Sequence, residues 1–230
     1  MQIAGLQKLT LLDFPGRIAC TVFLPGCNLR CPFCHNASLV LPQQDSPPPM
    51  TADELLAFLQ KRRGRLQGVC ITGGEPTLHP DLPDLLRQIH LLGFEVKLDT
   101  NGTNPQMLRT ILADGLADYV AMDIKNSPAR YTETCGGVDM LDQVRESAAL
   151  LMESGINYEF RTTLAHPLHT WEDMVAIGQW LHGARRYFLQ QFVDSGDLIG
   201  ADLFPLTQEE MEAMRQAVLP HIKNTELRGI

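Results

Sequence analysis

Apolar segments and amphipathic segments alternate along most of the chain. Strands are predicted where short apolar runs occur, over residues 68–72, 94–100, 119–125, 158–164 and 187–192. Helices are predicted between and after these runs, over residues 79–92, 105–113, 141–154, 170–182 and 207–218. A further helix is predicted to begin at Thr51, where Glu54 three residues later completes a capping box, and to end near Arg62.

The first residues predict a β-hairpin that leads into this alternation. The strand-like residues 8–12 and 18–24 flank Pro15-Gly16, a pair typical of a type II turn. Residues 1–24 then form the hairpin and first strand, residues 25–36 a cysteine-bearing loop, and residues 42–49 a proline-rich surface connection. We expect no internal repeat and a single domain over residues 1–230.

About six β–α units result when the strand before the cysteines is counted. This alternation predicts an α/β fold with a parallel sheet and right-handed crossovers. A doubly wound sheet and a partial (β/α)6 barrel both satisfy the pattern. No Gly-x-Gly-x-x-Gly follows the first strand, which disfavours a dinucleotide-binding version.

Composition narrows the class of protein. The chain has 230 residues, is 44% hydrophobic and 20% charged, and contains no apolar run that could span a bilayer. Its first residues lack the features of a signal peptide, so a cytoplasmic location with no membrane partner is expected. The net charge of −8 argues against a nucleic-acid partner. The one basic run, residues 61–65, is interpreted as a solvated helix end.

Six cysteines in such a chain indicate metal ligands or core residues more than a disulfide framework. Cys20 and Cys70 lie in apolar strand-like runs and are expected to be buried. Cys135 lies in a predicted loop, where an exposed and reactive thiol is possible, although a lone loop thiol is usually incidental.

Three cysteines have a spacing that indicates a metal or iron–sulfur site. Cys27, Cys31 and Cys34 form the pattern Cys-x-x-x-Cys-x-x-Cys. A cubane iron–sulfur cluster normally takes one thiolate per iron, so three thiolates leave one iron open for a reactant. The alternative is a zinc site with His35 as the fourth ligand, although His35 directly follows Cys34, which makes shared binding of one tetrahedral ion awkward.

Polar residues end each later strand of the predicted sheet. The carboxyl ends of parallel strands are where functional groups gather, and residues two apart on a strand point the same way. The candidate side chains and glycines at these ends are Gly73, Gly74 and Glu75; Asp99 and Asn101; Asp123 and Lys125; and Arg161 and Thr163. Burying so many charges without partners would be costly, so a polar, charged ligand is expected above the cluster.

Each of these groups also has a structural explanation. Asp123 and Lys125 could form an internal ion pair, Asp99 could cap the next helix, and a Gly-Gly pair is usually a turn. The agreement between several strand ends makes a purely structural explanation of all of them the weaker hypothesis.

Taken together, the cysteine trio, Gly-Gly-Glu-Pro and the six β–α units resemble the radical S-adenosylmethionine enzymes. Finer motifs resemble the activating enzymes of glycyl-radical enzymes, and among these the anaerobic ribonucleoside-triphosphate reductase activating proteins. These motifs are Leu11-Leu12-Asp13-Phe14-Pro15-Gly16, Cys31-Pro32-Phe33-Cys34-His35-Asn36, Asp99-Thr100-Asn101-Gly102, Met122-Asp123-Ile124-Lys125, Tyr158-Glu159-Phe160-Arg161-Thr162-Thr163 and Leu189-Gln190-Gln191-Phe192. The resemblance favours the partial barrel and spans nearly the whole chain.

The resemblance implies a role for each candidate residue. Cys27, Cys31 and Cys34 would hold a [4Fe–4S] cluster whose open iron binds the methionine part of S-adenosylmethionine. Phe33 would pack near the adenine, and Gly73, Gly74 and Glu75 would hold the methionine ammonium. The remaining contacts, to the methionine and ribose portions, would come from Asp99, Asn101, Asp123 and Lys125, with Arg161 and Thr163 nearby. Relatives with a histidine near the sixth strand differ from this chain, which has Gln191-Phe192 there.

The implied reaction is reductive cleavage of S-adenosylmethionine to a 5′-deoxyadenosyl radical, which removes a glycine Cα hydrogen from a partner enzyme. The expected partner is anaerobic ribonucleotide reductase, and the expected electron donor is a flavodoxin or ferredoxin. No side chain is assigned as a general acid or base, and His166 and His169 are interpreted as loop residues or partner contacts. Two alternatives stay open: a radical enzyme acting on a small molecule or modified peptide, and a non-catalytic zinc-binding protein.

Overall fold

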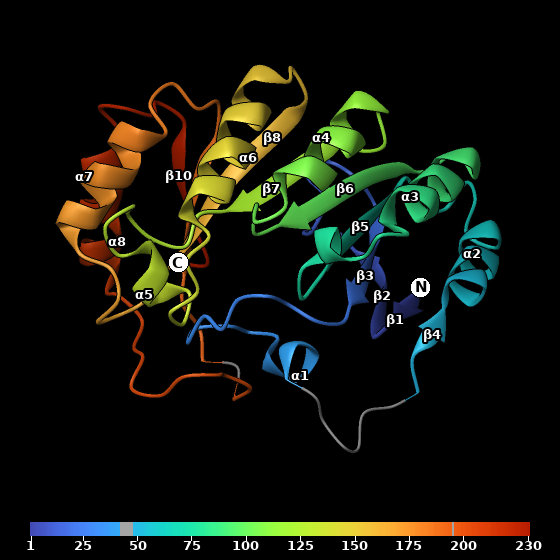
Figure 1. Cartoon of the computed structure of the whole chain (residues 1–230), viewed down its shortest axis with the longest axis horizontal. Coiled ribbons are helices and arrows are strands. Elements are labelled where there is room, and N and C mark those ends of the chain that lie inside the picture. The colour runs from blue at the N-terminus through green and yellow to red at the C-terminus, as the bar shows by residue number, and fades with distance from the viewer. Residues whose placement is uncertain (42–47, 195) are drawn as a thin grey trace. The chain divides into compact units, whose positions relative to one another are not determined.

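Residues 1–41, 48–194 and 196–230 are described by the computed structural model (Figure 1). The chain divides into two compact units. The first unit consists of Met1–Asn28, Ser38–Thr100 and Asn104–Ala121, and the second of Leu29–Ala37, Asn101–Thr103 and Met122–Ile230. Most of the predicted proline-rich connection, residues 42–47, lies outside the described residues. The expectation of a single domain stays a prediction.

Strands of the first unit follow the predicted hairpin and the predicted parallel pattern. Their order is β2-β3-β5-β6-β7, with β2–β3 antiparallel and both β3–β5 and β5–β6 parallel. The bounds are Gly5–Thr10 for β2, Ala19–Leu24 for β3, Gly68–Gly73 for β5, Glu95–Thr100 for β6 and Tyr119–Asp123 for β7, whose first three residues belong to this unit. The predicted turn is present, because Gly16 has φ of 70° and the Arg17 amide donates to the Phe14 carbonyl at 3.1 Å.

Three main helices of the first unit begin at side-chain caps or prolines. They are α2 (Ala52–Gln60), α3 (Leu82–Leu91) and α4 (Pro105–Ala113). The predicted capping box at α2 is confirmed, because Thr51 accepts from the Glu54 amide and the Glu54 carboxylate accepts from the Thr51 amide. Short elements that the pattern did not predict are β1 (Gln2–Ile3), paired with β4 (Met50–Thr51), the helix α1 (Ala37–Val40) and the 3-10 helix η1 (Pro76–Leu78).

Parallel strands and three long helices also make up the second unit. Its strand order is β7-β8-β9-β10, formed by the last two residues of β7 with β8 (Asn157–Leu164), β9 (Tyr187–Gln191) and β10 (Thr225–Arg228). The helices are α5 (Tyr131–Thr134), α6 (Leu141–Glu153), α7 (Trp171–Trp180) and α8 (Gln208–Val218). Strand β10 was not predicted, because Glu226 and Arg228 interrupt the apolar pattern of this short segment.

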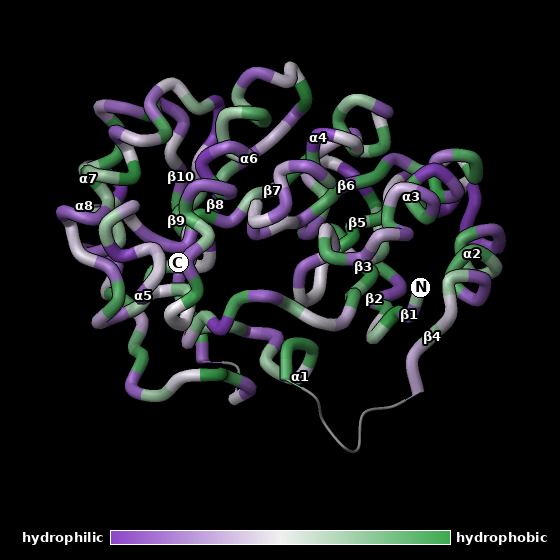
Figure 2. Tube along the Cα trace, in the orientation of Figure 1, coloured by the Kyte–Doolittle hydropathy of each residue, from purple (hydrophilic) through white to green (hydrophobic). Residues whose placement is uncertain are grey.

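Burial follows the expected periodicity within each element. In α3 the buried residues are Leu82, Leu85, Leu86 and Ile89, which is the spacing of one helix face. Figure 2 shows hydrophobic and hydrophilic residues interleaved along the helices, as expected for helices with one buried face. Cys20 and Cys70 are fully buried, which confirms the prediction for these two thiols.

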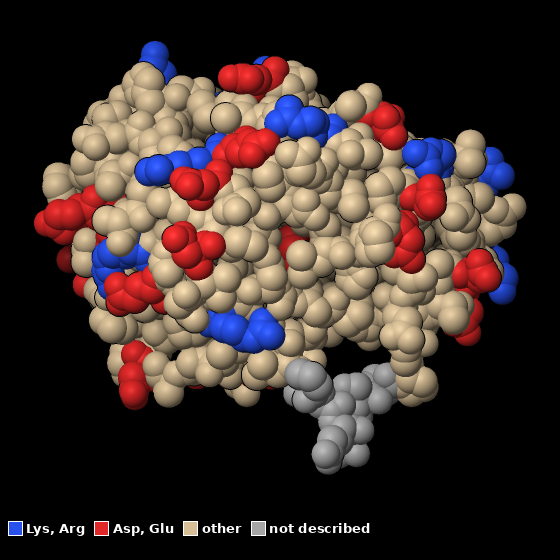
Figure 3. Space-filling view, viewed as in Figure 1, with Lys and Arg blue, Asp and Glu red and all other residues tan. Residues whose placement is uncertain are grey.

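Surface charges of both signs are mixed on the face shown in Figure 3, where Lys and Arg lie among Asp and Glu. Among the helices in the described part of the chain, none has the length and apolar content needed to cross a membrane.

The cap of α8 provides a test of how the helix ends contribute to stability. Thr207 accepts from the Glu210 amide at 3.2 Å and forms a capping box with it. Thr207→Ala should cost about 1 kcal/mol and lower Tm by about 2–4 °C, measured by circular dichroism. The control is Thr110→Ala, because exposed Thr110 lies inside α4 and only donates to the Gln106 carbonyl. Equal Tm values for the two variants would contradict this role.

Candidate functional site

The ends of β3 and β5 in the first unit meet through their main chains. Leu24 pairs with Gly73, and the Gly74 amide donates to the Leu24 carbonyl at 2.9 Å. Gly73 has φ of +122°, and a Cβ there would collide with the Leu24 main chain. A Cβ on Gly74 would likewise collide with the carbonyl of Gly26. The two glycines are therefore required by the close approach of the segment that carries Cys27.

Glu75 is fully buried beside these glycines. Its Oε1 atom accepts hydrogen bonds from the Thr77 amide at 3.0 Å, the Thr77 hydroxyl at 2.5 Å and the Thr100 hydroxyl at 2.7 Å. Such donors offset the cost of burying a carboxylate. Glu75 thus caps η1 and fixes the shape of the segment, while its predicted contact with a methionine ammonium stays a prediction.

Asp99 on β6 forms an ion pair with Lys97, a residue that the sequence analysis did not select. The Lys97 side chain is only 2% exposed, and its Nζ atom also lies 3.8 Å from the Cys70 sulfur. The sequence could have indicated Lys97, because it lies two residues before Asp99 on the same strand and therefore shares a face with it. The alternative in which Asp99 caps the next helix is wrong, because Asn104 caps α4.

In the second unit, Asp123 lies between two cations. Its carboxylate oxygens are 3.0 Å from the Lys125 Nζ and 2.8 Å from the Arg161 Nε. Burial acts to raise the pKa of Asp123, but the two cations outweigh burial and hold this pKa well below its ordinary value. Burial acts to lower the pKa of Lys125, and Asp123 reverses this effect. The ion pair expected as an alternative is therefore present, and Arg161 extends it.

Two more predicted residues lie in the second unit at strand ends. Asn101 is 5% exposed, and its Oδ1 atom accepts from the amide and the hydroxyl of Thr103 at 2.9 and 2.7 Å. Thr163 lies two residues after Arg161 on β8, and both side chains are half-buried while their neighbours are buried. The shared face predicted for Arg161 and Thr163 is therefore supported by the burial pattern.

Phe33, in the loop between the second and third cysteines, lies near Lys125. Its side chain is buried, and the Lys125 Nζ is 5.8 Å from its ring centre. The ring of His169 packs on Phe33 edge-on, with 5.9 Å between the ring centres. Two residues that the resemblance assigns to the same cosubstrate are thus neighbours.

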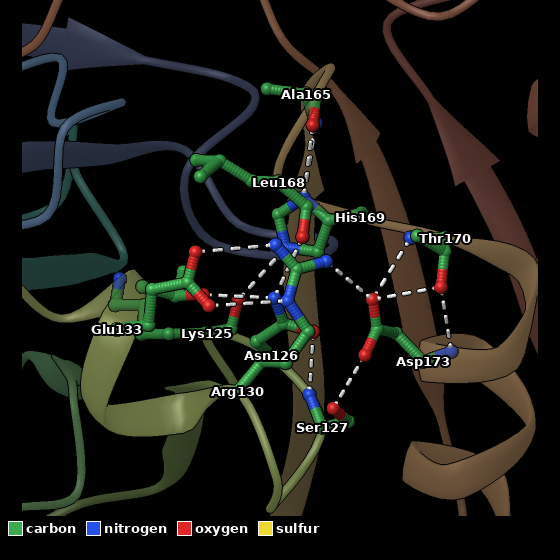
Figure 4. A network of polar contacts seen from close by, with 11 residues as sticks. Lys125, Asn126, Ser127, Arg130, Glu133, Ala165, Leu168, His169, Thr170 and Asp173 are labelled. Atoms are coloured by element: carbon green, nitrogen blue, oxygen red, sulfur yellow. Dashed lines mark hydrogen bonds and ion pairs between the residues drawn. The ribbon is translucent and has the colours of Figure 1, made fainter.

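His169 fixes the main chain at Lys125. Its Nε2 atom is 2.9 Å from the Lys125 carbonyl, and its Nδ1 atom is 3.2 Å from the Ala165 amide (Figure 4). A neutral ring with the proton on Nε2 satisfies both contacts, and burial lowers the pKa of His169 accordingly. His169 is therefore a structural residue. His166 is more exposed and contacts Glu210 at 3.1 Å.

A polar network formed by the residues that follow Lys125 joins the loops after β7 and β8 (Figure 4). Asn126 donates to the Leu168 carbonyl at 2.9 Å. Ser127 and Arg130 both bond the Asp173 carboxylate, at 2.6 and 3.1 Å. The sequence analysis missed this network, because its partners are more than 40 residues apart.

The cysteine trio is divided between the two units, with Cys27 in the first and Cys31 and Cys34 in the second. None of the three is in a disulfide, and the Cys34 amide donates to the Cys31 carbonyl at 3.1 Å, which makes a tight turn. Cysteine thiolates are the ligands that iron–sulfur clusters use. The residues present therefore fit the predicted cluster by their chemistry.

A single-ion site receives no support from the geometry. Within residues 1–41, 48–194 and 196–230, no three His, Cys, Asp or Glu side chains are grouped to hold one metal ion. A zinc ion needs its four ligands around one point, whereas each cluster thiolate binds a different iron. The ring of His35, proposed as the fourth zinc ligand, packs on Phe192 with 5.8 Å between ring centres.

Cys135 is buried, so the suggestion of an exposed, reactive thiol is wrong. It forms a side-chain hydrogen bond with Cys31. This bond lowers the pKa of the Cys31 thiol to about 7, although burial opposes the shift.

Comparison with known proteins identifies the class. Residues 21–181 match the Radical SAM superfamily, and the chain belongs to this superfamily. Streptococcus suis SuiB bound to the precursor peptide SuiA shares the fold, with a TM-score of 0.68 at 16% identity, over 95% of this chain and 50% of SuiB. The α/β architecture with a mostly parallel sheet is that of a partial barrel, as predicted. The protein is therefore a radical enzyme that uses a [4Fe–4S] cluster and S-adenosylmethionine.

The named relatives of this chain include activating enzymes of glycyl-radical enzymes. A Methanocaldococcus jannaschii protein, named as a candidate glycyl-radical enzyme activating enzyme, is 29% identical over 99% of this chain and 96% of its own length. The pyruvate formate-lyase-activating enzyme of Clostridium pasteurianum is 33% identical over 54% of this chain and 52% of that protein. The 7-carboxy-7-deazaguanine synthase of Thermococcus kodakarensis is 31% identical over 72% of this chain and 69% of that enzyme.

The contact between Gly74 and Gly26 gives a test of the cluster-binding loop. Gly74→Ala should push the Gly26 carbonyl away and displace the adjoining Cys27. We expect a loss of iron affinity of about 10–100-fold, as for other changes next to metal ligands. Iron and labile sulfide would be measured after anaerobic reconstitution in competition with a chelator.

Gly5→Ala is the matched control for this test, because a Cβ on Gly5 would lie at an ordinary 3.5 Å from Phe23. It should keep the iron content of the unchanged protein. If Gly74→Ala kept the same iron content as Gly5→Ala, the close approach would have no role in shaping the cysteine loop.

Proposed function

We propose that this protein is an activase that installs the radical of a glycyl-radical enzyme. The observation that carries the proposal is the similarity to the Methanocaldococcus jannaschii relative, which extends over 99% of this chain and 96% of that protein. The similarity to a pyruvate formate-lyase-activating enzyme supports the same class of reaction.

The [4Fe–4S] cluster and S-adenosylmethionine, when bound, would supply the reductive radical chemistry that removes a Cα hydrogen from a glycine of the partner. The residues of the chain would bind and orient these groups. Cys27, Cys31 and Cys34 would hold the cluster. The residues that would bind the cosubstrate are Phe33, Gly73, Gly74, Glu75, Asp99, Asn101, Asp123, Lys125, Arg161 and Thr163.

Charge pairing supports this assignment for the second unit. Lys125 and Arg161 each form a hydrogen-bonded ion pair with Asp123. Fixed charges of this kind need little rearrangement when a charged ligand arrives. Phe33 lies next to Lys125, and its aromatic ring would pack near the adenine.

We further propose that the partner is an anaerobic ribonucleotide reductase and that a flavodoxin or ferredoxin donates the electron. The motifs Leu11-Leu12-Asp13-Phe14-Pro15-Gly16 and Leu189-Gln190-Gln191-Phe192 support this choice of partner by their resemblance to such activating proteins. The proposal includes a cytoplasmic location, with neither a membrane nor a nucleic acid as partner.

A second candidate function is the modification of a small molecule. The similarity to a 7-carboxy-7-deazaguanine synthase, over 72% of this chain, favours it. The fold of Escherichia coli QueE, with a TM-score of 0.59, covers all of this chain but shows only a common architecture at 16% identity.

One experiment separates the two functions. The reconstituted protein would be incubated anaerobically with reduced flavodoxin, S-adenosylmethionine and an anaerobic ribonucleotide reductase, and the products followed by electron paramagnetic resonance and chromatography. We expect a glycyl-radical signal together with 5′-deoxyadenosine. The variant Cys34→Ala, which lacks one predicted ligand, should give neither. Formation of 5′-deoxyadenosine without a glycyl radical on any tested partner would favour the small-molecule function.

The ion cluster gives a test of the cosubstrate site. Asp123→Asn removes the counter-charge of Lys125 and Arg161, so both cations should change position. We expect about a 10-fold weaker affinity for S-adenosylmethionine, equal to about 1.4 kcal/mol, measured by equilibrium dialysis with the reconstituted protein. Glu212→Gln, which breaks an ion pair with Arg215 on α8, is the control and should bind normally. Equal affinities of the two variants would remove Asp123 from the site.

A further inference from the structure

Cys135 is a buried thiol next to a predicted cluster ligand, and the proposed function does not use it. Its exposed fraction is 0%, against 6% for Cys31, and a side-chain hydrogen bond joins the two residues. Both belong to the second unit, although the loop of Cys31 and the short helix α5 are far apart in the sequence.

Main-chain contacts fix the position of Cys135 against the cysteine loop. The Arg30 amide donates to the Cys135 carbonyl at 3.2 Å. The next residue, Gly136, has φ of +75°, and a Cβ there would collide with the Arg30 carbonyl. Arg30, the residue directly before Cys31, is therefore held by Cys135 and by the residue that follows it.

A second set of contacts fixes α5 to the segment that follows β7. The Thr134 hydroxyl accepts from the Asn126 side chain at 2.8 Å, and the Tyr131 hydroxyl accepts from the Lys125 amide at 3.4 Å. At the start of the helix, Arg130 joins Glu133 and Asp173 (Figure 4). Cys135 thus stands at the end of a helix that is fixed to the segment carrying Lys125.

The direction of the hydrogen bond follows from chemistry. A cysteine bound to iron is a thiolate, so Cys31 would have no proton to donate. The thiol of Cys135 must then be the donor and the Cys31 sulfur the acceptor. If Cys135 instead bound the fourth iron, it would close the position that S-adenosylmethionine requires.

We infer that Cys135 is a positioning residue whose S–H group donates to the Cys31 sulfur and raises the reduction potential of the cluster. The inference rests on the proposed function, in which Cys31 is a cluster ligand. Reduction places additional negative charge on the cluster and its sulfurs. A donor to one of these sulfurs therefore stabilises the reduced state more than the oxidised state.

The test compares three variants after anaerobic reconstitution. Cys135→Ala removes the donor, Cys135→Ser replaces it with a hydroxyl donor, and Cys20→Ala removes an equally buried thiol in strand β3. The measurement is the midpoint potential of the cluster, followed by electron paramagnetic resonance without S-adenosylmethionine. We expect the reduction equilibrium of Cys135→Ala to fall about tenfold, which is about 59 mV for a one-electron couple. Cys135→Ser and Cys20→Ala should stay close to the unchanged protein.

Two results would overturn the inference. An unchanged potential in Cys135→Ala would overturn the inference. So would folded Cys135→Ala and Cys135→Ser proteins that both lose iron, because Cys135 would then be a ligand. If Cys135→Ala fails to fold, Cys135→Val makes the same comparison, since it fills the space without a donor. Failure of the proposed function would look different, because the unchanged protein would then either bind no cluster or bind one without producing a glycyl radical.

Discussion

The close approach of two main-chain segments in the first unit is the constraint on which the site depends. Strands β3 and β5 pair so that Leu24 lies opposite Gly73, and the Glu75 amide donates to the Gly26 carbonyl at 2.8 Å. The loop that begins at Cys27 and the Gly-Gly-Glu-Pro segment consequently leave the sheet at the same edge. Side chains at Gly73 or Gly74 would force them apart. Packing thus requires the Gly-Gly pair of this motif, in addition to the predicted role of the pair in binding.

Ionisable groups among the predicted cosubstrate contacts are paired with other side chains. Lys97 pairs with Asp99, Asp123 with both Lys125 and Arg161, and Glu75 accepts hydrogen bonds from hydroxyl and amide donors. Partners of this kind offset desolvation and hold the side chains in fixed positions. Fixed side chains of this kind fit the proposed role of binding and orienting the cosubstrate, with the reactive chemistry supplied by the cluster and the cosubstrate.

Much of the fold could be predicted from local patterns. Helix α4 has the predicted bounds, and the capping box at Thr51 and the hairpin turn at Pro15-Gly16 are present. These features depend on residues within a few positions of one another, so the sequence displays them directly. Strand β10 was missed because its Arg228 is stabilised by a remote partner, Glu159, and its polar residues hide a strand pattern.

By itself the sequence showed which donors are available, three closely spaced thiols and a Gly-Gly-Glu-Pro segment after a strand, and its resemblance to a known family indicated the class of chemistry. Only the tertiary structure decided what surrounds those donors. It gave Glu75 its partner Thr100, brought Arg161 to Asp123, and placed Cys135, expected in a loop, as a buried neighbour of Cys31. The physical reason is that burial and pairing join residues from different strands and loops, and no local pattern records which of them will meet.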